Sequence, residues 1–189
     1  LAKVMAAIEP FQEGERTLGH NTILSYFAQH QADELDPRDS VIETLEKANS
    51  GQTNTQLRTA LGAFLFNGDD VFKKTDVLSG GERNRVHLAK LLRRGGNVLL
   101  LDEPTNDLDV TTLRNLENAI LDFSGCVLVI SHDRFFLDRI CTHLLVFEGN
   151  SKVRWFEGNF GEYQEKRKQE LGGKEEHRRS KYKKLTIHQ

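Results

Sequence analysis

Two adjacent carboxylates at the end of an apolar run are the residues of this chain best suited to chemistry. The run Val98–Leu101 is followed by Asp102 and Glu103, and a continuous apolar run is typical of a parallel strand covered on both faces. Ligands of open α/β sheets bind at the carboxyl ends of the strands. One carboxylate there can hold Mg²⁺ through water, and the next can polarise an attacking water. The pair fits phosphoryl transfer to water, but a strand ending in a solvated acidic turn has the same pattern.

A second candidate is the turn LSGGE, which opens a predicted helix. Ser79 can cap that helix, and Gly80 and Gly81 allow another backbone to approach closely. Free N–H groups at a helix N-terminus bind phosphate. A capped helix after a flexible turn would use the same residues, so both interpretations stay open.

Two more polar residues follow other predicted strands. In ISHD, Ser131 is a candidate helix cap, and His132 would lie at the same sheet edge as Glu103, where an imidazole can bond a γ-phosphate or the attacking water. Gln29 follows a predicted strand at 22–27, and its amide can bond a Mg²⁺ water as well as the attacking water. Each is weak evidence by itself, since a lone histidine in a turn is most often a surface residue.

Alternating strands and helices must position these side chains. Apolar runs predict buried strands at 97–103, 126–131 and 143–148, with helices between them at 108–123 and 132–142. This order is typical of an open α/β sheet. One more strand, at an edge, is predicted at 152–158.

The rest of the chain is predicted to be mostly helical. Helices are expected over 38–77 and 81–96, and the polar tail from residue 160 onward is expected to be helical in part. Residues 1–8 have the spacing of a buried helical stripe, formed by Leu1, Val4, Met5 and Ile8.

Composition narrows the functional classes. Hydrophobic residues make up 38% of the 189 residues and charged residues 29%, which is typical of a soluble globular domain. No apolar run approaches the roughly 20 residues that span a bilayer, and we expect a cytoplasmic protein. Cys126 and Cys141 lack metal-ligand spacing and are predicted to be buried thiols in a reducing compartment.

Charge is distributed unevenly along the chain. The net charge is −2, but Glu165–Lys184 holds nine lysines and arginines against four glutamates. A basic tail on an acidic body suggests a polyanionic partner. A solvated helix with i,i+4 ion pairs is the alternative, and the charge pattern alone favours it.

In this order the motifs resemble the downstream half of an ATP-binding cassette. LSGGE resembles the cassette signature, VLLLDE the Walker B strand with its catalytic glutamate, NDLD the D-loop, His132 the switch histidine and Gln29 the Q-loop glutamine. The resemblance covers nearly the whole chain. It implies an α/β fold of the ABC-type P-loop NTPase class, with a parallel core sheet and a helical signature subdomain at about 36–94. The cassette would occupy 1–158 and a basic tail 159–189.

The phosphate-binding loop of such a cassette is not found. No G-x-x-x-x-G-K-[ST] occurs in the sequence, and Leu1 would directly follow the missing serine or threonine. We therefore expect a cassette truncated just after Walker A, which by itself should not hydrolyse ATP.

The resemblance also implies roles for individual residues. Glu103 and His132 would be catalytic, and Mg²⁺ would be held through water by Asp102 and Gln29. Two cassettes would close head to tail over ATP, with Asp109 at their interface. The residues expected at ATP are Gln29, Ser79, Gly80, Gly81, Glu82 and Asp109.

The variant of the motifs indicates one class of cassette protein. DEPTNDLD with Asn106, SHDRFFLDRI and WFEGNFGEYQEKR resemble the soluble ABC-F class. Its members carry two cassettes, and this chain resembles the second. The resemblance implies an ATPase and translation factor, with the first cassette of the same chain, the ribosome, rRNA and tRNA as partners and no membrane. The ATPase subunit of a transporter is the alternative; a non-catalytic interaction domain would not need Glu103 and His132.

Overall fold

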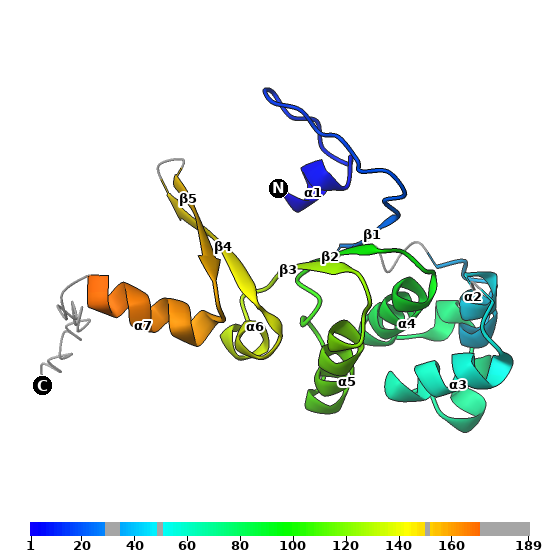
Figure 1. The fold of residues 1–189 in the computed structure, drawn as a ribbon. Coiled ribbons are helices and arrows are strands. Elements are labelled where there is room, and N and C mark those ends of the chain that lie inside the picture. Colours follow the sequence, from blue (N-terminus) through cyan, green and yellow to red (C-terminus); the bar gives the residue numbers. More distant parts are fainter. Residues whose placement is uncertain (29–34, 49–50, 150–151, 171–189) are drawn as a thin grey trace, which may run out of the picture. The chain divides into compact units, whose positions relative to one another are not determined.

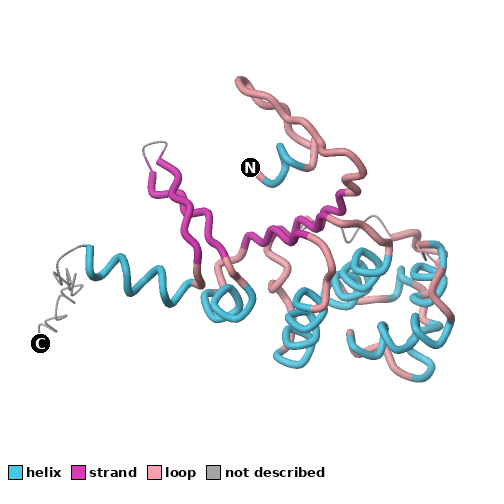
Figure 2. Tube along the Cα trace, in the orientation of Figure 1, coloured by secondary structure: helices cyan, strands magenta, loops and turns pink. Residues whose placement is uncertain are grey.

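The computed structural model describes residues 1–28, 35–48, 51–149 and 152–170. The chain forms two compact units, Leu1–Ile140 and Cys141–Gln189. Figure 1 shows the order of their helices and strands, and Figure 2 colours the same trace by secondary structure.

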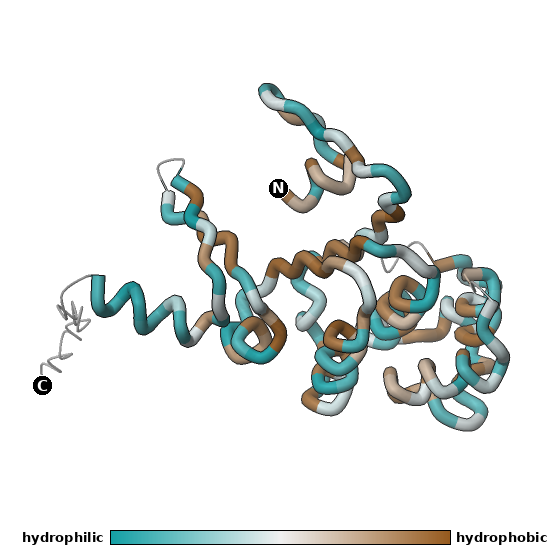
Figure 3. Tube along the Cα trace, in the orientation of Figure 1, coloured by the Kyte–Doolittle hydropathy of each residue, from teal (hydrophilic) through white to brown (hydrophobic). Residues whose placement is uncertain are grey.

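A parallel sheet of three strands is the centre of the first unit. The strands β1 (Leu24–Phe27), β2 (Val98–Asp102) and β3 (Cys126–Ile130) lie in the order β1-β2-β3. The middle strand β2 is buried along Leu99–Leu101, as its continuous apolar run predicts, and β2 and β3 are mostly brown in Figure 3. The predicted α/β fold with a parallel sheet is confirmed.

Helices cover one face of this sheet and form a helical region beside it. The helix α4 (Gly80–Arg93) contacts β1, and α5 (Val110–Leu121) contacts α6 (Arg134–Ile140). In Figure 1, α4 and α5 lie on the same side of the sheet. The elements of the region predicted to be mostly helical are α2 (Val41–Lys47), α3 (Asn54–Ala63), η2 (Gly68–Phe72) and η3 (Thr75–Val77).

Local capping explains where the helices of this region begin. Each of α2, α3 and α4 starts with a capping box, in which an N-cap hydroxyl and a side chain three residues later each accept a backbone N–H. Two donors that a helix start leaves without partners are thereby satisfied. The caps are formed by Ser40 with Glu43, Thr53 with Gln56, and Ser79 with Glu82.

The predicted buried stripe at residues 1–8 is wrong. Helix α1 spans only Ala2–Met5, and Leu1 and Ile8 are more than half exposed. Ala7 has a φ of 60°, a left-handed conformation that a right-handed helix cannot continue through. Ile8 therefore leaves the helical spacing before Pro10 is reached.

The strands predicted at 143–148 and 152–158 both form, but their predicted place in the open sheet is wrong. The strand β4 (His143–Gly149) pairs antiparallel with β5 (Lys152–Glu157), and these two form a separate two-stranded sheet in the described part of the chain. Strands close in sequence can pair through a short turn, whereas a parallel partner needs a long crossover. One face of the hairpin is packed by α7 (Phe160–Glu170), where the rings of Phe156 and Tyr163 are 5.5 Å apart.

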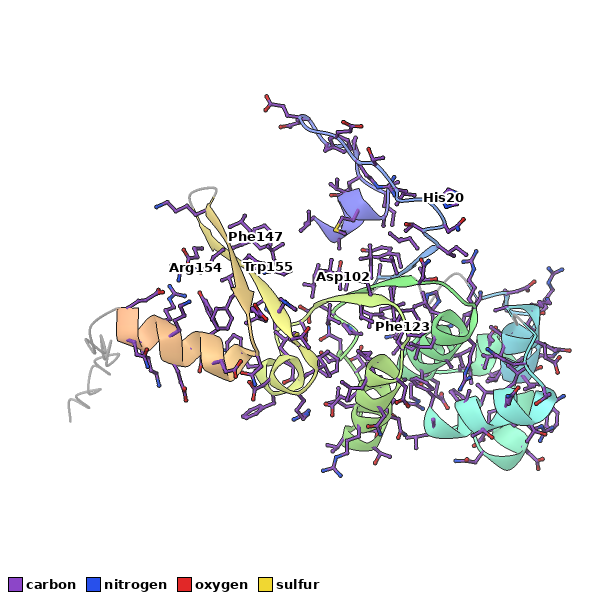
Figure 4. All side chains as sticks on the ribbon, in the orientation of Figure 1. His20, Asp102, Phe123, Phe147, Arg154 and Trp155 are labelled. Carbon is purple, nitrogen blue, oxygen red and sulfur yellow. The ribbon has the colours of Figure 1, made fainter. Side chains whose placement is uncertain are left out.

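The opposite face of the hairpin and the strand β3 are less covered than their apolar sequences suggest. Figure 4 labels Phe147 and Trp155, whose side chains are 63% and 67% exposed.

Cys126 is exposed at the start of β3, so the prediction that both cysteines are buried is wrong for this one. The physical reason is that β3 lies at an edge of the described sheet, where burial depends on a neighbour along that edge. Cys141 is partly buried, and burial raises the pKa of its thiol.

Candidate active site

The carboxyl edge of the parallel sheet brings three of the predicted residues together. Asp102 ends β2 and pairs in register with Ile130, the last residue of β3. Glu103 and His132 follow these two strands, so both lie at the same edge. The predicted shared edge is thus what the strand register produces, and Figure 4 labels Asp102 at the end of β2.

Glu103 is held in an unusual backbone conformation. Its φ is 51°, a left-handed region that costs a non-glycine residue about 1–3 kcal/mol. The Glu103 N–H donates to the Ile130 carbonyl at 2.8 Å, which ties the strained turn to the end of β3. Such strain persists only where the surroundings enforce it, and it is concentrated at functional sites.

The Glu103 carboxylate faces His132 and has an unused acceptor. Its Oε2 accepts the His132 backbone N–H at 3.3 Å, and its Oε1 lies 3.5 Å from His132 Nε2. The Glu103 side chain is only 13% exposed, yet Oε1 has no hydrogen-bond partner among the described residues. A buried acceptor without a donor is costly, and a water or a ligand group at this position would satisfy it.

Asp102 is bonded from the neighbouring strand. Its Oδ2 accepts the Tyr26 hydroxyl at 3.2 Å. Burial, and then the negative charge and hydrogen bond of Asp102, raise the pKa of Tyr26 to about 12, so the hydroxyl remains a donor at neutral pH. Sequence reasoning missed Tyr26, because only the strand pairing shows that it lies on the same sheet face as Asp102.

The carboxylates at this edge are suitable donors for Mg²⁺. Among the described residues, no three histidine, cysteine or acidic side chains gather as a metal cluster. Mg²⁺ keeps most of its waters and is commonly bound by one or two carboxylates together with substrate phosphates. Asp102 at the strand end suits that role, with the Glu103 Oε1 acceptor beside it.

The turn after β3 is capped differently from the prediction. Ser131 Oγ accepts the Asp133 backbone N–H at 3.0 Å and lies 3.1 Å from Thr105 Oγ1. It is Asp133 that caps α6, since its Oδ1 accepts the backbone N–H groups of Phe135 and Phe136. Ser131 therefore joins the turn that follows β2 to the turn that follows β3. The next residue, His132, has a side chain that is 98% exposed.

The signature turn presents backbone rather than reactive side chains. Ser79 caps α4, and Glu82 Oε2 accepts both the Ser79 N–H at 2.8 Å and its hydroxyl at 2.7 Å. These two hydrogen bonds keep the pKa of Glu82 below its usual value. A Cβ added at Gly80 would meet no atom of the described residues within 4 Å, and one at Gly81 would lie 3.7 Å from the Asp107 carbonyl oxygen.

Asp109 has a clear structural role in this chain. It is the N-cap of α5: Oδ1 accepts two backbone N–H groups, at 2.9 and 3.0 Å, and Oδ2 accepts the Thr112 hydroxyl at 2.7 Å. The hydroxyl and the backbone N–H of Thr112 contribute most to a pKa of Asp109 that lies below its usual value. The predicted site residue Gln29 lies outside the described residues.

Fold and site together define a class of protein. The chain matches the ABC transporter family over residues 3–106, more than half of its length, and it belongs to this family of ATP-binding cassettes. In the part of the chain that the structure describes, no helix is both long and apolar enough to cross a membrane.

The sequence is similar to a particular group of these proteins. It is 50% identical over 180 residues to the energy-dependent translational throttle protein EttA of Mycobacterium tuberculosis, covering 91% of this chain and 32% of that protein. It is 48% identical over 191 residues to EttA of Escherichia coli K12, covering 98% and 34%. This resemblance is predicted by the run LAKLLRRGGNVLLLDEPTNDLD and by the ending HRRSKYKKL, and it is confirmed. Two other segments, YFAQHQAD and FLFNGDD, look more like other ABC-F branches. The chain spans about a third of the length of these relatives.

Two solved structures match the fold of this chain. The RNase-L inhibitor matches with a TM-score of 0.68 and 28% identity, over 90% of this chain and 34% of that one. The archaeal ribosome recycling factor aABCE1, in its complex with the ribosomal stalk protein aP1, matches with a TM-score of 0.69 at the same identity and coverage.

Proposed function

We propose that this chain is the second cassette of a longer ABC-F protein, which binds and hydrolyses ATP and acts on the ribosome in the cytoplasm. The observation that carries the proposal is the strained Glu103 turn, which sets a buried, unsatisfied carboxylate oxygen 3.5 Å from His132 and next to Asp102. This arrangement occurs in a chain about half identical to translational throttle proteins.

The reaction would be the transfer of the ATP γ-phosphoryl group to water. Glu103 would accept a hydrogen bond from the attacking water through Oε1 and polarise it, a role that a carboxylate fills well. His132, exposed and beside Glu103, would bond the γ-phosphate or steady that water. Asp102 and Gln29 would hold Mg²⁺ through water, and the ion would offset charge on the phosphates.

The signature turn would serve a second nucleotide. Ser79, Gly80, Gly81 and Glu82 form a helix start with open space around Gly80, and helix N-termini favour phosphate. In a head-to-tail pair of cassettes this turn would close over ATP held by the first cassette. Asp109, by capping α5, would fix the D-loop at the interface and couple the two sites.

A direct test uses the full-length protein that contains this chain. Magnesium-dependent ATP hydrolysis and ATP-dependent co-sedimentation with ribosomes are both expected. Absence of hydrolysis in the presence and absence of ribosomes would reject the enzymatic proposal. ATP-dependent association with membranes rather than ribosomes would favour the transporter alternative.

The ribosomal role rests on the relatives and on charge. The cassette is proposed to end at residue 158, and the segment 159–189 carries the excess of lysine and arginine. Phosphate contacts by such residues give an affinity that falls with salt. Deleting residues 172–189 is expected to weaken ribosome pelleting and flatten its salt dependence, while ATP hydrolysis without ribosomes is unchanged. Pelleting with the parental salt dependence would show that the tail does not contact rRNA or tRNA.

A further inference from the structure

Tyr26 reaches the candidate metal-side carboxylate from a neighbouring strand. It lies on β1 opposite Leu100 in the parallel register. Because side chains alternate between faces of a strand, Tyr26, Leu100 and Asp102 share one face of the sheet. The long phenol spans the remaining two residues, and its hydroxyl donates to Asp102 Oδ2 at 3.2 Å.

We propose that Tyr26 is a positioning residue for Asp102: its hydroxyl holds Oδ2 so that the carboxylate presents Oδ1 to the water shell of Mg²⁺. The inference rests on the proposed function of the edge as an ATP site. Tyr26 itself would not touch the metal or the nucleotide. It would act only through the orientation of Asp102.

The need for such a partner follows from the side chain of aspartate. Its last torsion is broad rather than confined to staggered wells, so an isolated carboxylate at a strand end can rotate. Among the described residues Tyr26 is the donor to Oδ2, and no donor to Oδ1 is found there. The hydrogen bond to Oδ2 restricts this rotation. Partners of this kind typically change metal affinity or activity by about 10–100-fold.

The backbone that carries Tyr26 is well placed for this task. The pairing of β1 with β2 runs from Leu24 with Val98 to Phe27 with Leu101, so the distance between the two strands is set by the ladder. On the opposite face, Phe27 is buried and lies 5.4 Å from the His87 ring, measured between ring centroids. The phenol hydroxyl therefore projects from a strand that is held by β2 along one edge and by the packing of Phe27 on one face.

The test compares Tyr26→Phe with the parent in the full-length protein, with the nucleotide site of the other cassette disabled. The measurement is the Mg²⁺ concentration that half-saturates binding of a fluorescent ATP analogue. We expect this concentration to rise about tenfold, with no change in the thermal midpoint. Mn²⁺ in place of Mg²⁺ allows the same comparison by electron paramagnetic resonance, which reports the metal environment without turnover.

Two controls separate positioning from packing. Tyr163→Phe removes the hydroxyl of a buried tyrosine in the other unit, one that accepts from Arg167 at 3.4 Å, and should leave the Mg²⁺ requirement unchanged. Asp102→Asn should raise it at least as much as Tyr26→Phe. The double variant should be no worse than Asp102→Asn alone, since Tyr26 acts through Asp102.

The outcomes distinguish this inference from the function it rests on. A parent protein without Mg²⁺-dependent nucleotide binding would reject the proposed function itself. A parent that binds normally, with Tyr26→Phe at the parental Mg²⁺ requirement, would overturn the positioning role alone. The positioning role would also be overturned if the effects of Tyr26→Phe and Asp102→Asn on the Mg²⁺ requirement were fully additive. A Tyr26→Phe variant that lowered only the thermal midpoint would overturn it as well.

Discussion

The sheet edge and the signature turn use polar residues in opposite ways. At the sheet edge, Glu103 has a strained backbone and a buried carboxylate oxygen without a partner among the described residues, and His132 is almost fully exposed. At the signature turn, Ser79 and Glu82 satisfy each other in a capping box, and what remains open is the backbone around Gly80.

This difference suggests a division of labour within one cassette. Groups left unsatisfied are free to act on a water or a phosphate, whereas satisfied groups stabilise the helix that presents a backbone surface. Changes at the sheet edge should therefore affect chemistry more than folding. Changes in the signature helix should affect the stability of the folded chain and the dependence of that stability on pH.

The largest expected effect comes from Glu103→Gln in the full-length protein. The amide keeps the shape of the side chain but polarises water poorly, and loss of a general base lowers rates by about 10²–10⁴-fold. ATP binding should persist, because Asp102 and the signature turn are unchanged. The checks are ATP turnover and ATP affinity; the variant should also stay on ribosomes longer than the parent.

Glu103 would not be the catalytic carboxylate if the variant turned over ATP at the parental rate. Asp102→Asn provides the contrast, since it should weaken Mg²⁺-dependent nucleotide binding as well as turnover. Two variants with the same binding defect would show that the adjacent carboxylates do not divide the work.

The next effect concerns the buried face of the signature helix. Burial, and then the charge of Lys90, lowers the pKa of His87 to about 4, against about 6.5 in the unfolded chain. The unfolded state therefore binds an additional proton between these values, so stability is complete above pH 6.5 and falls as the pH drops toward 4. The loss is on the order of 3 kcal/mol across that window.

His87→Leu should reduce this dependence. Urea unfolding at pH 7.5 and pH 4.5 would give the free energy of unfolding at each pH, and the difference between them should be smaller in the variant. His20, which is exposed and labelled in Figure 4, provides the control: His20→Leu should keep the parental difference. If the free energy of unfolding fell equally between pH 7.5 and pH 4.5 in His87→Leu and in the parent, other groups would control acid unfolding.

The smallest effect is expected from the caps. Ser79→Ala removes the hydroxyl that accepts the Glu82 N–H at 3.3 Å and should lower the free energy of unfolding by about 1 kcal/mol. Ser79→Asn should retain most of the stability that the cap provides, because asparagine is a good N-cap. Asp109→Ala should cost a similar amount at the start of α5. Full stability in Ser79→Ala would show that packing of α4, rather than its cap, fixes the helix start.

The sequence by itself determined the order of the motifs and part of the local structure. The cap of α4 follows from Ser79 in LSGGE, and the apolar run before Asp102 predicts the buried middle strand. Because parallel strands end at one edge, the positions of Glu103 and His132 after their strands were enough to place them together. These inferences depend on neighbours in sequence or on a general rule of sheet topology.

Only the tertiary structure decided which residues pair across the chain. The bond from Tyr26 to Asp102 depends on the register of β1 against β2, and the left-handed turn at Glu103 depends on the Ile130 carbonyl. The pairing of β4 with β5 instead of the central sheet, and the exposure of Cys126, depend on what lies beside an edge strand. An apolar sequence shows that a strand is suited to burial. Whether the strand is buried depends on the elements that pack beside it, and the local sequence does not specify those elements.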